Sequence, residues 1–392
     1  MATTIADVAH RAGCSTATVS RVLSGVGGAR PATRDRVEAA ARELGFRPSD
    51  VARSLKRQST LTLGLIVTDI ENPYFPQLVK GVEEAAIGEG YAILLCSADD
   101  DPDREASYLD ILVERRVDGI IVAASTIGLS QAAWLARPPV PVVLVNTSVR
   151  SGELPSVASD NRAGGRLATR HLLGLGHRRF GYLMPPARNL DAPERLAGVR
   201  DELDAAGLAS DGPDAALAVS DGAPTVVGGE IAMAALLARS PRPTAIVAYN
   251  DLMAIGAMRA IRRHGLRVPQ DVSLVGFDDV ALAAYVEPAL TTLRQETGEM
   301  GRWAVATLTE QLAGRRAGGG SRRPGGSGGA PGGAAGSGSG SGTGTPGAAG
   351  SGSGTRTSGA AGSGSGASSS VAERRVVPVH LEVRESTGPP PD

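Results

Sequence analysis

The sequence predicts an α/β protein with a small all-α head, a body built on parallel β-sheets, and a long segment of low complexity. Three observations support this prediction. Residues 4–47 show helical spacing of apolar residues between capping residues. From residue 61, short β-branched runs alternate with helical patterns, whereas residues 313–370 are mostly Gly, Ala, Ser and Thr with scattered Pro and Arg.

The first predicted helix begins after Thr4. Thr4 and Asp7 have the spacing of a capping pattern, in which each side chain can bond an otherwise unpaired backbone N–H. One face of this helix is apolar: Ile5, Val8, Ala9 and Ala12. Gly13 permits the left-handed conformation that a tight helix exit needs, so a second helix can follow at once.

Ser15 can cap that second helix, whose Val19, Val22 and Leu23 are expected to point inward. Its outward face consists of Thr16, Ala17, Thr18 and Arg21. Short side chains let a helix approach base edges, and an arginine one turn later can reach a phosphate or a guanine. The pair therefore indicates a helix-turn-helix that reads DNA, although a small helical hairpin with a polar surface has the same pattern.

The distribution of charge favours the DNA-binding interpretation. Residues 1–60 contain ten Lys and Arg against five acids, a net charge of +5. Because the whole chain carries −1, the remainder carries −6. A cationic head on an acidic body suggests that phosphate is contacted at one end only.

Two further helical segments complete the head. Pro31 suits the first position of a third helix that ends at Gly45, but Arg30 offers no usual cap. After Pro48, residues 49–57 form a short basic helical segment with one prominent leucine, Leu55. So short a helix is marginal in isolation.

The body is predicted to alternate strands and helices, which implies parallel sheets covered on both faces. Helices are expected at 74–88, 103–115 and 303–312. Strands are expected at 61–68, 92–97, 119–123, 142–145, 179–184, 245–248, 273–276 and, near the C-terminal end, 376–383.

Polar residues follow several of these strands, where sheets of this kind bind ligands. The strand ends run into Asp69, Asn146, Asn250-Asp251 and Asp278-Asp279. Together they could supply donors and acceptors to a polyhydroxylated ligand. Helix capping is the alternative role, and we prefer it for Asp251 and in part for Asp279.

Composition and motifs limit the remaining function classes. No apolar run is long enough to span a bilayer, and the first sixty residues are polar and cationic, so we expect no membrane association and a cytoplasmic location. The two cysteines fall in different predicted domains and are expected to be reduced thiols. We find no GxSxG elbow, phosphate loop or metal-spaced cluster, and expect no enzyme activity, cofactor or metal.

The runs TIADVAHRAGCSTATVSRVLSG and ARELGFRPSDVARSLK resemble the DNA-binding head and hinge of the LacI (lactose repressor) family of transcription regulators. The resemblance implies that hinge helices of two subunits pair in the minor groove, where a leucine wedges into a base step. It assigns DNA binding to Thr4, Ser15, Thr16, Ala17, Thr18 and Arg21 in the head, and to Ala52, Arg53, Leu55 and Lys56 in the hinge.

The body resembles the periplasmic-binding-protein-like core of the same family through DIENPYF, ERLAG, YNDLMAIGAMRAI, LRVPQDVSLVGFDD and ALTTLRQ. This implies two α/β subdomains joined by three crossovers, with an effector between them. The implied effector-binding residues are Asp69, Tyr74, Phe75, Asn146, Asp160, Arg195, Asn250 and Asp278. Residues 220–224 lack the aromatic residue that often stacks on the ligand in this family.

The expected domains are 1–47 (head), 48–60 (hinge helix and linker), 61–312 plus 371–386 (effector-binding and dimerisation domain) and 313–370 (a disordered insertion). We expect a homodimeric repressor of a pseudopalindromic operator in double-stranded DNA, controlled by a small-molecule effector, with a sugar inducer preferred. The alternatives are a solute-binding protein without DNA function and a regulator that uses a non-sugar co-repressor.

Overall fold

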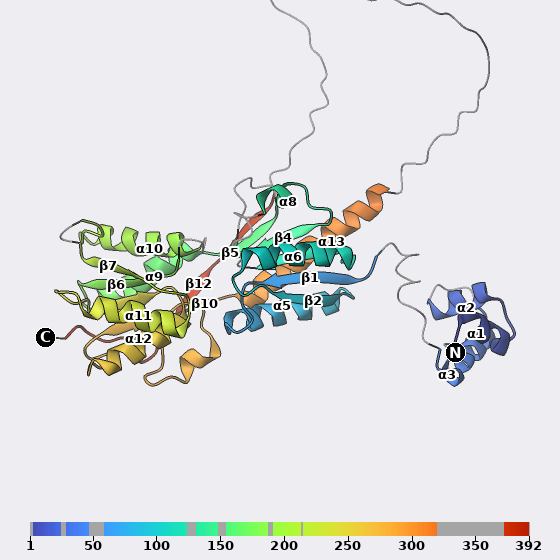
Figure 1. The fold of residues 1–392 in the computed structure, drawn as a ribbon, viewed down its shortest axis with the longest axis horizontal. Helices are drawn as coiled ribbons and strands as arrows, with labels where there is room; N and C mark the ends of the chain where they lie inside the picture. The colour runs from blue at the N-terminus through green and yellow to red at the C-terminus, as the bar shows by residue number, and fades with distance from the viewer. Residues whose placement is uncertain are drawn as a thin grey trace, which may run out of the picture.

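The structure is a computed structural model that describes residues 3–24, 29–46, 59–123, 131–147, 154–186, 191–212, 215–319 and 372–391. The described parts form a three-helix head and an α/β body (Figure 1). Among these residues, no helix combines the length and hydropathy needed to cross a membrane.

The head consists of α1 (Ile5–Ala12), α2 (Thr16–Leu23) and α3 (Pro31–Glu43). Its small core is formed by buried side chains of all three helices, with Val8, Val19 and Val37 fully buried. Ile5, expected on the inner face of α1, is 37% exposed because it lies in the first turn, beyond the packed part of the helix. The core thus fixes the relative orientation of α1 and α2.

The first subdomain of the body contains a six-stranded parallel sheet of order β11-β5-β4-β3-β1-β2. Helices α5 and α13 cover one face of this sheet, and α6 and α8 cover the other. The elements are β1 (Thr62–Val67), α5 (Tyr74–Gly88), β2 (Ala92–Ser97), α6 (Pro102–Glu114), β3 (Gly119–Ala123), α8 (Ala132–Ala136), β4 (Val142–Val145), β5 (Ser156–Ser159), α13 (Thr297–Gly319) and β11 (Arg374–Val377).

The second subdomain contains a four-stranded parallel sheet of order β7-β6-β8-β9. Helices α9 and α10 pack on one face, and α11 and α12 pack on the other. The elements are α9 (Asn161–Gly174), β6 (Phe180–Met184), α10 (Ala192–Ala205), β7 (Leu217–Asp221), α11 (Val226–Leu237), β8 (Ala245–Ala248), α12 (Asp251–Arg263), β9 (Ser273–Val275) and η1 (Ala281–Ala284).

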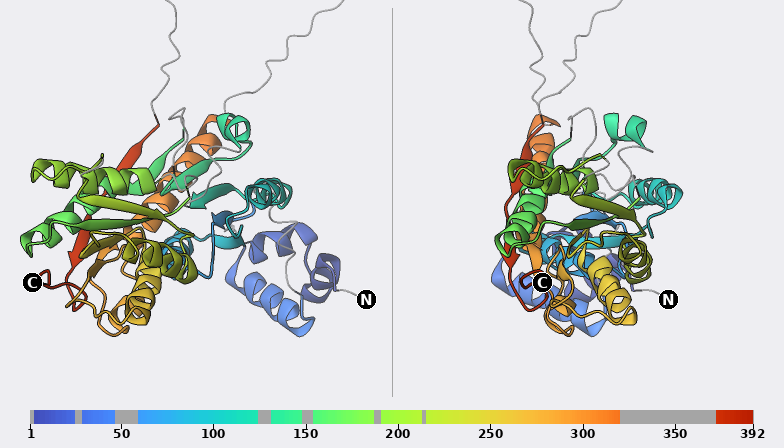
Figure 2. Two further views of the ribbon diagram at one scale, coloured as in Figure 1. Left: turned by 60° about the vertical axis from the view of Figure 1, so that its left-hand side comes forward. Right: turned by 90° about the vertical axis from the view of Figure 1, so that its left-hand side faces the viewer.

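The chain passes three times between the two subdomains, as the order of the elements and sheets shows. One pass is made by the C-terminal segment drawn in red in Figure 2. It crosses from β5 to α9, from β10 (Thr292–Gln295) to α13, and from β11 to β12 (Val379–Glu382). Strands β10 and β12 pair antiparallel with each other. The carboxyl ends of β1 and β4 therefore face the second subdomain, and the space between the subdomains is enclosed by strand ends.

The predicted fold class is confirmed, with differences in individual elements. The strand expected at 376–383 is two strands, because Pro378 has no backbone N–H and separates β11 from β12. The strand expected at 92–97 is β2, which lies at the sheet edge: Cys96 is buried, but Leu94 and Leu95 are more than a third exposed. The strands β5, β7 and β10 are four or five residues long and were not predicted.

The disordered insertion was predicted to begin at residue 313, which is too early. Residues 313–319 continue α13, because the preceding turns are packed on the sheet and Arg316 bonds to Ser59 and Tyr91. The remainder of the insertion, 320–370, and the hinge residues Ala52, Arg53, Leu55 and Lys56 lie outside the described residues.

Glycines allow the paired helices of the second subdomain to touch. A Cβ on Gly165 of α9 would lie 2.1 Å from the carbonyl oxygen of Arg195, and one on Gly198 of α10 would lie 2.0 Å from that of Arg162. Contacts this short leave no room for a methyl group. The close packing of α9 and α10 positions Arg195, which α10 carries.

We predict that Gly165→Ala lowers the free energy of unfolding by about 2–3 kcal/mol, because the helices must separate to admit the methyl group. Denaturant unfolding would measure the loss. Gly174→Ala on the same helix is the matched control, since nothing lies within 4 Å of a Cβ there. Equal stability of the two variants would contradict this account of the α9–α10 contact.

Candidate functional site

The second helix of the head presents an exposed polar face. Thr16, Ala17 and Arg21 of α2 are exposed, Thr18 is half-buried, and Val19 on the opposite side is fully buried. The inner residues Val22 and Leu23 pack against the head core, as predicted. This leaves a row of short side chains followed by an arginine on the free side of the helix.

Caps define where the first two helices start. The Thr4 hydroxyl accepts from the Asp7 backbone N–H, and the Asp7 carboxylate accepts from the Thr4 N–H at 2.8 Å, which completes the predicted capping box. The Ser15 hydroxyl accepts from the Thr18 N–H at 3.2 Å. Helix α3 begins with Pro31 and has no side-chain cap, as its sequence indicates. The positive end of the α2 dipole is therefore fixed at the turn before Thr16.

A cavity of about 530 Å³ lies between the two subdomains of the body. Loops after β1, β2 and β4 line it from the first subdomain, and loops beside β6, β7, β8 and β9 line it from the second. Its lining residues are Thr68, Asp69, Glu71, Asn72, Tyr74, Phe75, Asp99, Asp100, Asn146, Pro186, Asp191, Arg195, Ala223, Pro224, Thr225, Tyr249, Asn250, Asp278 and Gln295.

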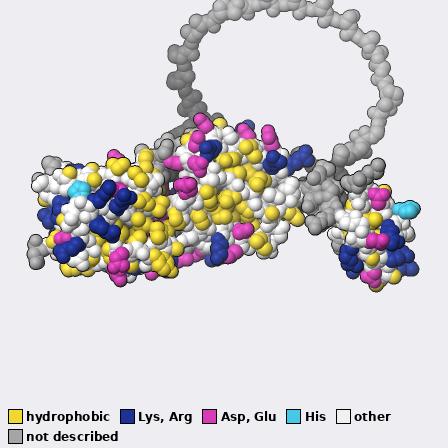
Figure 3. Space-filling model, turned by 60° about the horizontal axis from the view of Figure 1, so that its bottom comes forward, with side chains coloured by type: hydrophobic (Ala, Val, Ile, Leu, Met, Phe, Trp, Pro, Cys, Tyr) yellow, Lys and Arg dark blue, Asp and Glu magenta, His cyan; other side chains and the backbone are white. Residues whose placement is uncertain are grey.

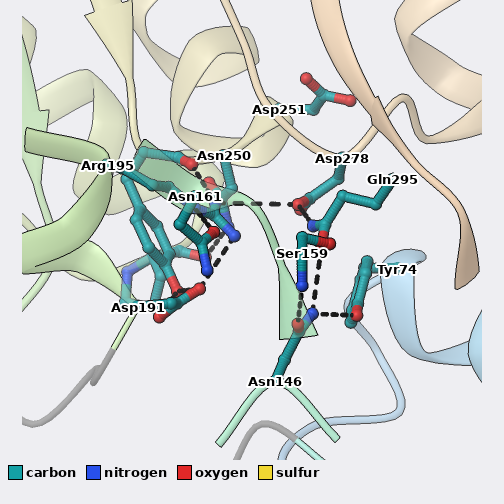
Figure 4. Close-up of polar contacts among 12 residues, drawn as sticks. Tyr74, Asn146, Ser159, Asn161, Asp191, Arg195, Asn250, Asp251, Asp278 and Gln295 are labelled. Carbon is teal, nitrogen blue, oxygen red and sulfur yellow. Dashed lines mark hydrogen bonds and ion pairs between the residues drawn. The ribbon is translucent and has the colours of Figure 1, made fainter. Parts of the chain in front are cut away.

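Arg195 is the central cation of the cavity, and its guanidinium is almost fully bonded (Figure 4). Its Nη2 donates to Asp191 at 2.8 Å, its Nε donates to Asn161 at 2.8 Å, and its Nη1 donates to the Tyr249 carbonyl at 2.6 Å. The guanidinium also lies 3.6 Å from the centroid of the Phe277 ring. Burial alone would lower the pKa of Arg195, but the surrounding negative groups raise it, so the side chain stays charged.

A second network joins the two subdomains beside Arg195. The Asn146 amide donates to the Tyr74 hydroxyl and, at 3.1 Å, to the side-chain oxygen of Gln295. The Gln295 amide donates in turn to Asp278 at 2.6 Å, and the Ser159 hydroxyl donates to Gln295 at 2.6 Å. Figure 4 shows this chain of bonds running from Tyr74 of α5 to Asp278 of the second subdomain.

Asp278 is held in a strained backbone conformation with φ of 118°, which side chains other than glycine rarely adopt. Its carboxylate lies 3.9 Å from Arg195 Nη1 and is almost fully buried. Burial raises the pKa of Asp278 to about 7, although Arg195 and the bond from Gln295 act in the opposite direction. Asp278 is thus a carboxyl group that can change protonation near neutral pH.

Of the eight residues expected to bind the effector, seven line this cavity: Asp69, Tyr74, Phe75, Asn146, Arg195, Asn250 and Asp278. Asp160 does not, because its carboxylate caps α9 by accepting from the Ala163 N–H at 2.9 Å. Asp251 is not a helix cap, the role preferred from the sequence. It is fully buried and accepts from Thr292 and from the Val280 N–H, while Asn250 caps α12.

Several residues of the cavity were not predicted from the sequence. Gln295 ends the unpredicted strand β10, so nothing in the sequence marked it as a strand-end residue. Asp99 and Asp100 follow the predicted strand β2 and could have been found by the same rule as Asp69. Asp191 precedes α10 and resembles a cap in the sequence, but in the structure it bonds Arg195 and the Tyr249 hydroxyl.

Two known families match this chain. Residues 4–49 match the family described as bacterial regulatory proteins, lacI family, and residues 169–326 match the periplasmic binding protein-like domain. A similar curated protein is the HTH-type transcriptional repressor PurR of Aliivibrio salmonicida (strain LFI1238). It is 36% identical over 310 residues, which cover 79% of this chain and 92% of PurR.

Solved structures of similar fold include two complexes with small molecules. The lac repressor dimer bound to operator and the anti-inducer ONPF matches with a TM-score of 0.77 and 26% identity, covering 99% of this chain and 100% of the repressor chain. The transcriptional regulator CelR in complex with cellobiose matches with a TM-score of 0.64 and 29% identity, covering 98% and 99% of the two chains.

The raised pKa of Asp278 predicts a pH effect on stability. Between the unfolded pKa of about 3.9 and the folded value of about 7, the folded protein holds more protons, so stability falls as pH rises through this window. In D278N this contribution is absent. Thermal unfolding at pH 5.5 and 8 should therefore show that the wild type loses more stability than D278N does, and parallel pH profiles would refute the raised pKa.

Proposed function

The chain belongs to the lacI family of bacterial regulatory proteins and is a DNA-binding transcription regulator. We propose that it represses transcription until a neutral sugar enters the cavity between its subdomains. One observation carries the proposal. A single chain joins a capped helix-turn-helix with an exposed polar face to a two-subdomain body that encloses a polar cavity. We propose that this cavity binds a ligand rather than turning it over.

We assign base contacts to Thr16, Ala17 and Arg21, which are exposed on α2, and to the half-buried Thr18 beside them. Thr4 and Ser15 cap α1 and α2, so they hold the positive N-termini of these helices in position to meet phosphates. The hinge assignment for Ala52, Arg53, Leu55 and Lys56 rests on the family resemblance alone, with Leu55 as the minor-groove wedge.

The charge of the cavity indicates a ligand without phosphate. Six acidic side chains and one basic side chain are among the described residues that line it. The one base, Arg195, already bonds Asp191, Asn161 and a carbonyl, so it has little capacity for an anion. Carboxylates accept hydrogen bonds from hydroxyl groups, and amides both accept from them and donate to them. The lining therefore suits a neutral polyhydroxylated molecule, and Tyr74, Phe75 and Tyr249 offer aromatic surface in place of the aromatic that residues 220–224 lack.

We propose that the protein is a homodimer that acts in the cytoplasm. Large hydrophobic side chains are exposed on both subdomains: Ile87, Leu94, Leu95 and Ile111 on the first, and Val227, Ile231, Leu282 and Tyr285 on the second. Hydrophobic side chains gather along much of the face drawn in Figure 3. Exposed apolar surface of this extent is typical of an interface between subunits. Two heads would then bind two half-sites.

We predict that selection from randomised duplexes yields a palindromic sequence with two half-sites. Arg21→Ala should weaken binding to it by about 1–3 kcal/mol, because a contact to a base edge is lost. Arg137→Ala, an exposed arginine of the body, is the control for loss of charge and should bind as the wild type does. If no duplex is enriched over random sequence in the presence or absence of sugars, the repressor proposal fails.

We predict that a neutral sugar raises the thermal unfolding midpoint, and that its phosphorylated counterpart does not. The probes are ribose, galactose, glucose and cellobiose, with ribose 5-phosphate and glucose 6-phosphate for comparison. A ligand at 100 times its Kd adds about 2.7 kcal/mol to stability, which is a shift of several degrees.

Arg195→Ala and Asp278→Asn should abolish the shift. Arg200→Ala on the same helix should keep it, since Arg200 pairs with Asp211 at 3.1 Å and does not line the cavity. Stabilisation by a sugar phosphate in preference to its neutral parent would contradict the proposed ligand class, and an equal shift in all variants would place the ligand outside the cavity.

A further inference from the structure

The start of the body is anchored to one buried carboxylate. Ser59 is the first described residue after 47–58, the segment that connects the head to the body. Asp118 accepts from the Ser59 hydroxyl, from the Thr60 N–H at 2.8 Å and from the Leu61 N–H at 3.1 Å. The Asp118 side chain is only 8% exposed. Three bonds to one buried carboxylate fix the path of residues 59–61, which we call the linker root.

The far end of α13 contacts the linker root. Arg316 Nη2 donates to the Ser59 hydroxyl oxygen at 2.8 Å and to the Tyr91 hydroxyl oxygen at 3.2 Å, and it lies 3.6 Å from Asp118. Because the Arg316 side chain is half exposed, its ion pair with Asp118 adds little stability. Its effect is geometric: it ties the last turns of α13 to the residue at which the body begins.

The near end of α13 begins at the cavity. Thr297, the first residue of α13, lies two positions after Gln295, which lines the cavity and bonds Asn146 and Asp278. In the first turn of α13, the Met300 sulfur lies 3.8 Å from the Ser159 hydroxyl oxygen, whose proton is donated to Gln295. The network that connects the two subdomains therefore continues directly into α13.

Between these ends α13 is one uninterrupted helix of 23 residues, which at ~1.5 Å per residue is about 34 Å long. It is packed tightly against α5, since a Cβ on Gly81 would lie 2.9 Å from Gly298 Cα and one on Gly301 would lie 2.7 Å from the Val82 nitrogen. Figure 1 shows α13 running along the first subdomain to the end at which β1 starts. A packed helix cannot shorten or bend freely, so displacement of one end moves the other.

We propose that α13 connects the effector cavity to the linker root, and that Arg316 is the positioning residue that couples the two. This inference rests on the proposed function, because it concerns how occupancy of the cavity reaches the head. A change in the bonds of Gln295 moves the start of α13, and Arg316 passes that movement to Ser59. Contact alone does not establish coupling, which requires that both ends bias the same equilibrium.

The first experiment needs neither effector nor operator. Trypsin can cut the head–body connection after Arg53, Lys56 and Arg57, and mass spectrometry separates these products from cuts at Arg322 and Arg356. In the full-length chain, Arg316→Met should speed cleavage of the connection about five- to tenfold, the range of a modest coupling. Arg315→Met is the matched control, because Arg315 is the adjacent exposed arginine of α13.

Arg316→Lys should be cleaved more slowly than Arg316→Met, since the lysine ammonium can still donate to Ser59. Asp118→Asn, which keeps the shape and removes the charge, should behave as Arg316→Met does. Cleavage of Arg316→Met within twofold of Arg315→Met would overturn the inference.

The second experiment separates coupling from simple structural support. It measures the effector-induced change in affinity for the selected operator, together with the effector Kd by calorimetry. Arg316→Met should reduce the effector-induced change at least fivefold and leave the effector Kd within twofold. The inference would be overturned if Arg316→Met lost both the effector-induced change in operator affinity and effector binding, or if it kept both. If the wild type selects no operator, the proposed function has failed, and the cleavage comparison still decides the role of Arg316.

Discussion

The structure of the site depends on the buried guanidinium of Arg195. Arg195 is 3% exposed, and transferring a guanidinium from water to such a place costs several kcal/mol unless its donors are bonded and its charge is balanced. Every neighbour serves this purpose: Asp191 pairs with it, the Tyr249 carbonyl and Asn161 accept from it, and Phe277 lies against its face. The requirement explains why the start of α9, the start of α10 and the end of β8 meet at one point, and why Gly165 and Gly198 hold α9 and α10 at backbone contact.

Bonds among residues of the second subdomain hold Arg195 on its side of the cavity, whereas the first subdomain contributes side chains on loops after β1, β2 and β4. The two halves are joined by the bonds from Tyr74 through Asn146 and Gln295 to Asp278. These bonds cross the boundary at a crossover strand, β10, so a ligand that competes for them acts on the connection between the subdomains as well as on the cavity wall. A ligand regulates a protein only if it binds two arrangements of that protein with different affinity, and competition for bonds between the subdomains is one source of such a difference.

The fold class could be predicted from the sequence because the helical and the strand patterns of apolar residues were both clear. Capping residues located α1 and α2, and apolar β-branched runs gave β3 and β4 with their observed bounds. Prediction from the sequence failed where short-range patterns carry little information. Strand β10 is only four residues long, and Gln295 acquires its role through contacts with Asn146 and Asp278, which are 149 and 17 positions away. Asp160 and Asp251 show a related ambiguity. Each lies just after a strand, but Asp160 caps a helix and Asp251 accepts from Thr292 and Val280. Only the packing distinguishes them from cavity residues.

The position of the low-complexity segment has a practical consequence. Residues 320–371 connect α13 to β11, two elements of the same subdomain, so the segment interrupts neither a paired strand nor any of the three crossovers. The cost of closing a loop grows only with the logarithm of its length, and the 52 residues of this segment already separate the two elements along the chain. This junction is therefore suited to genetic insertion of a further domain, such as a fluorescent protein, without interrupting the strand pairing of either sheet.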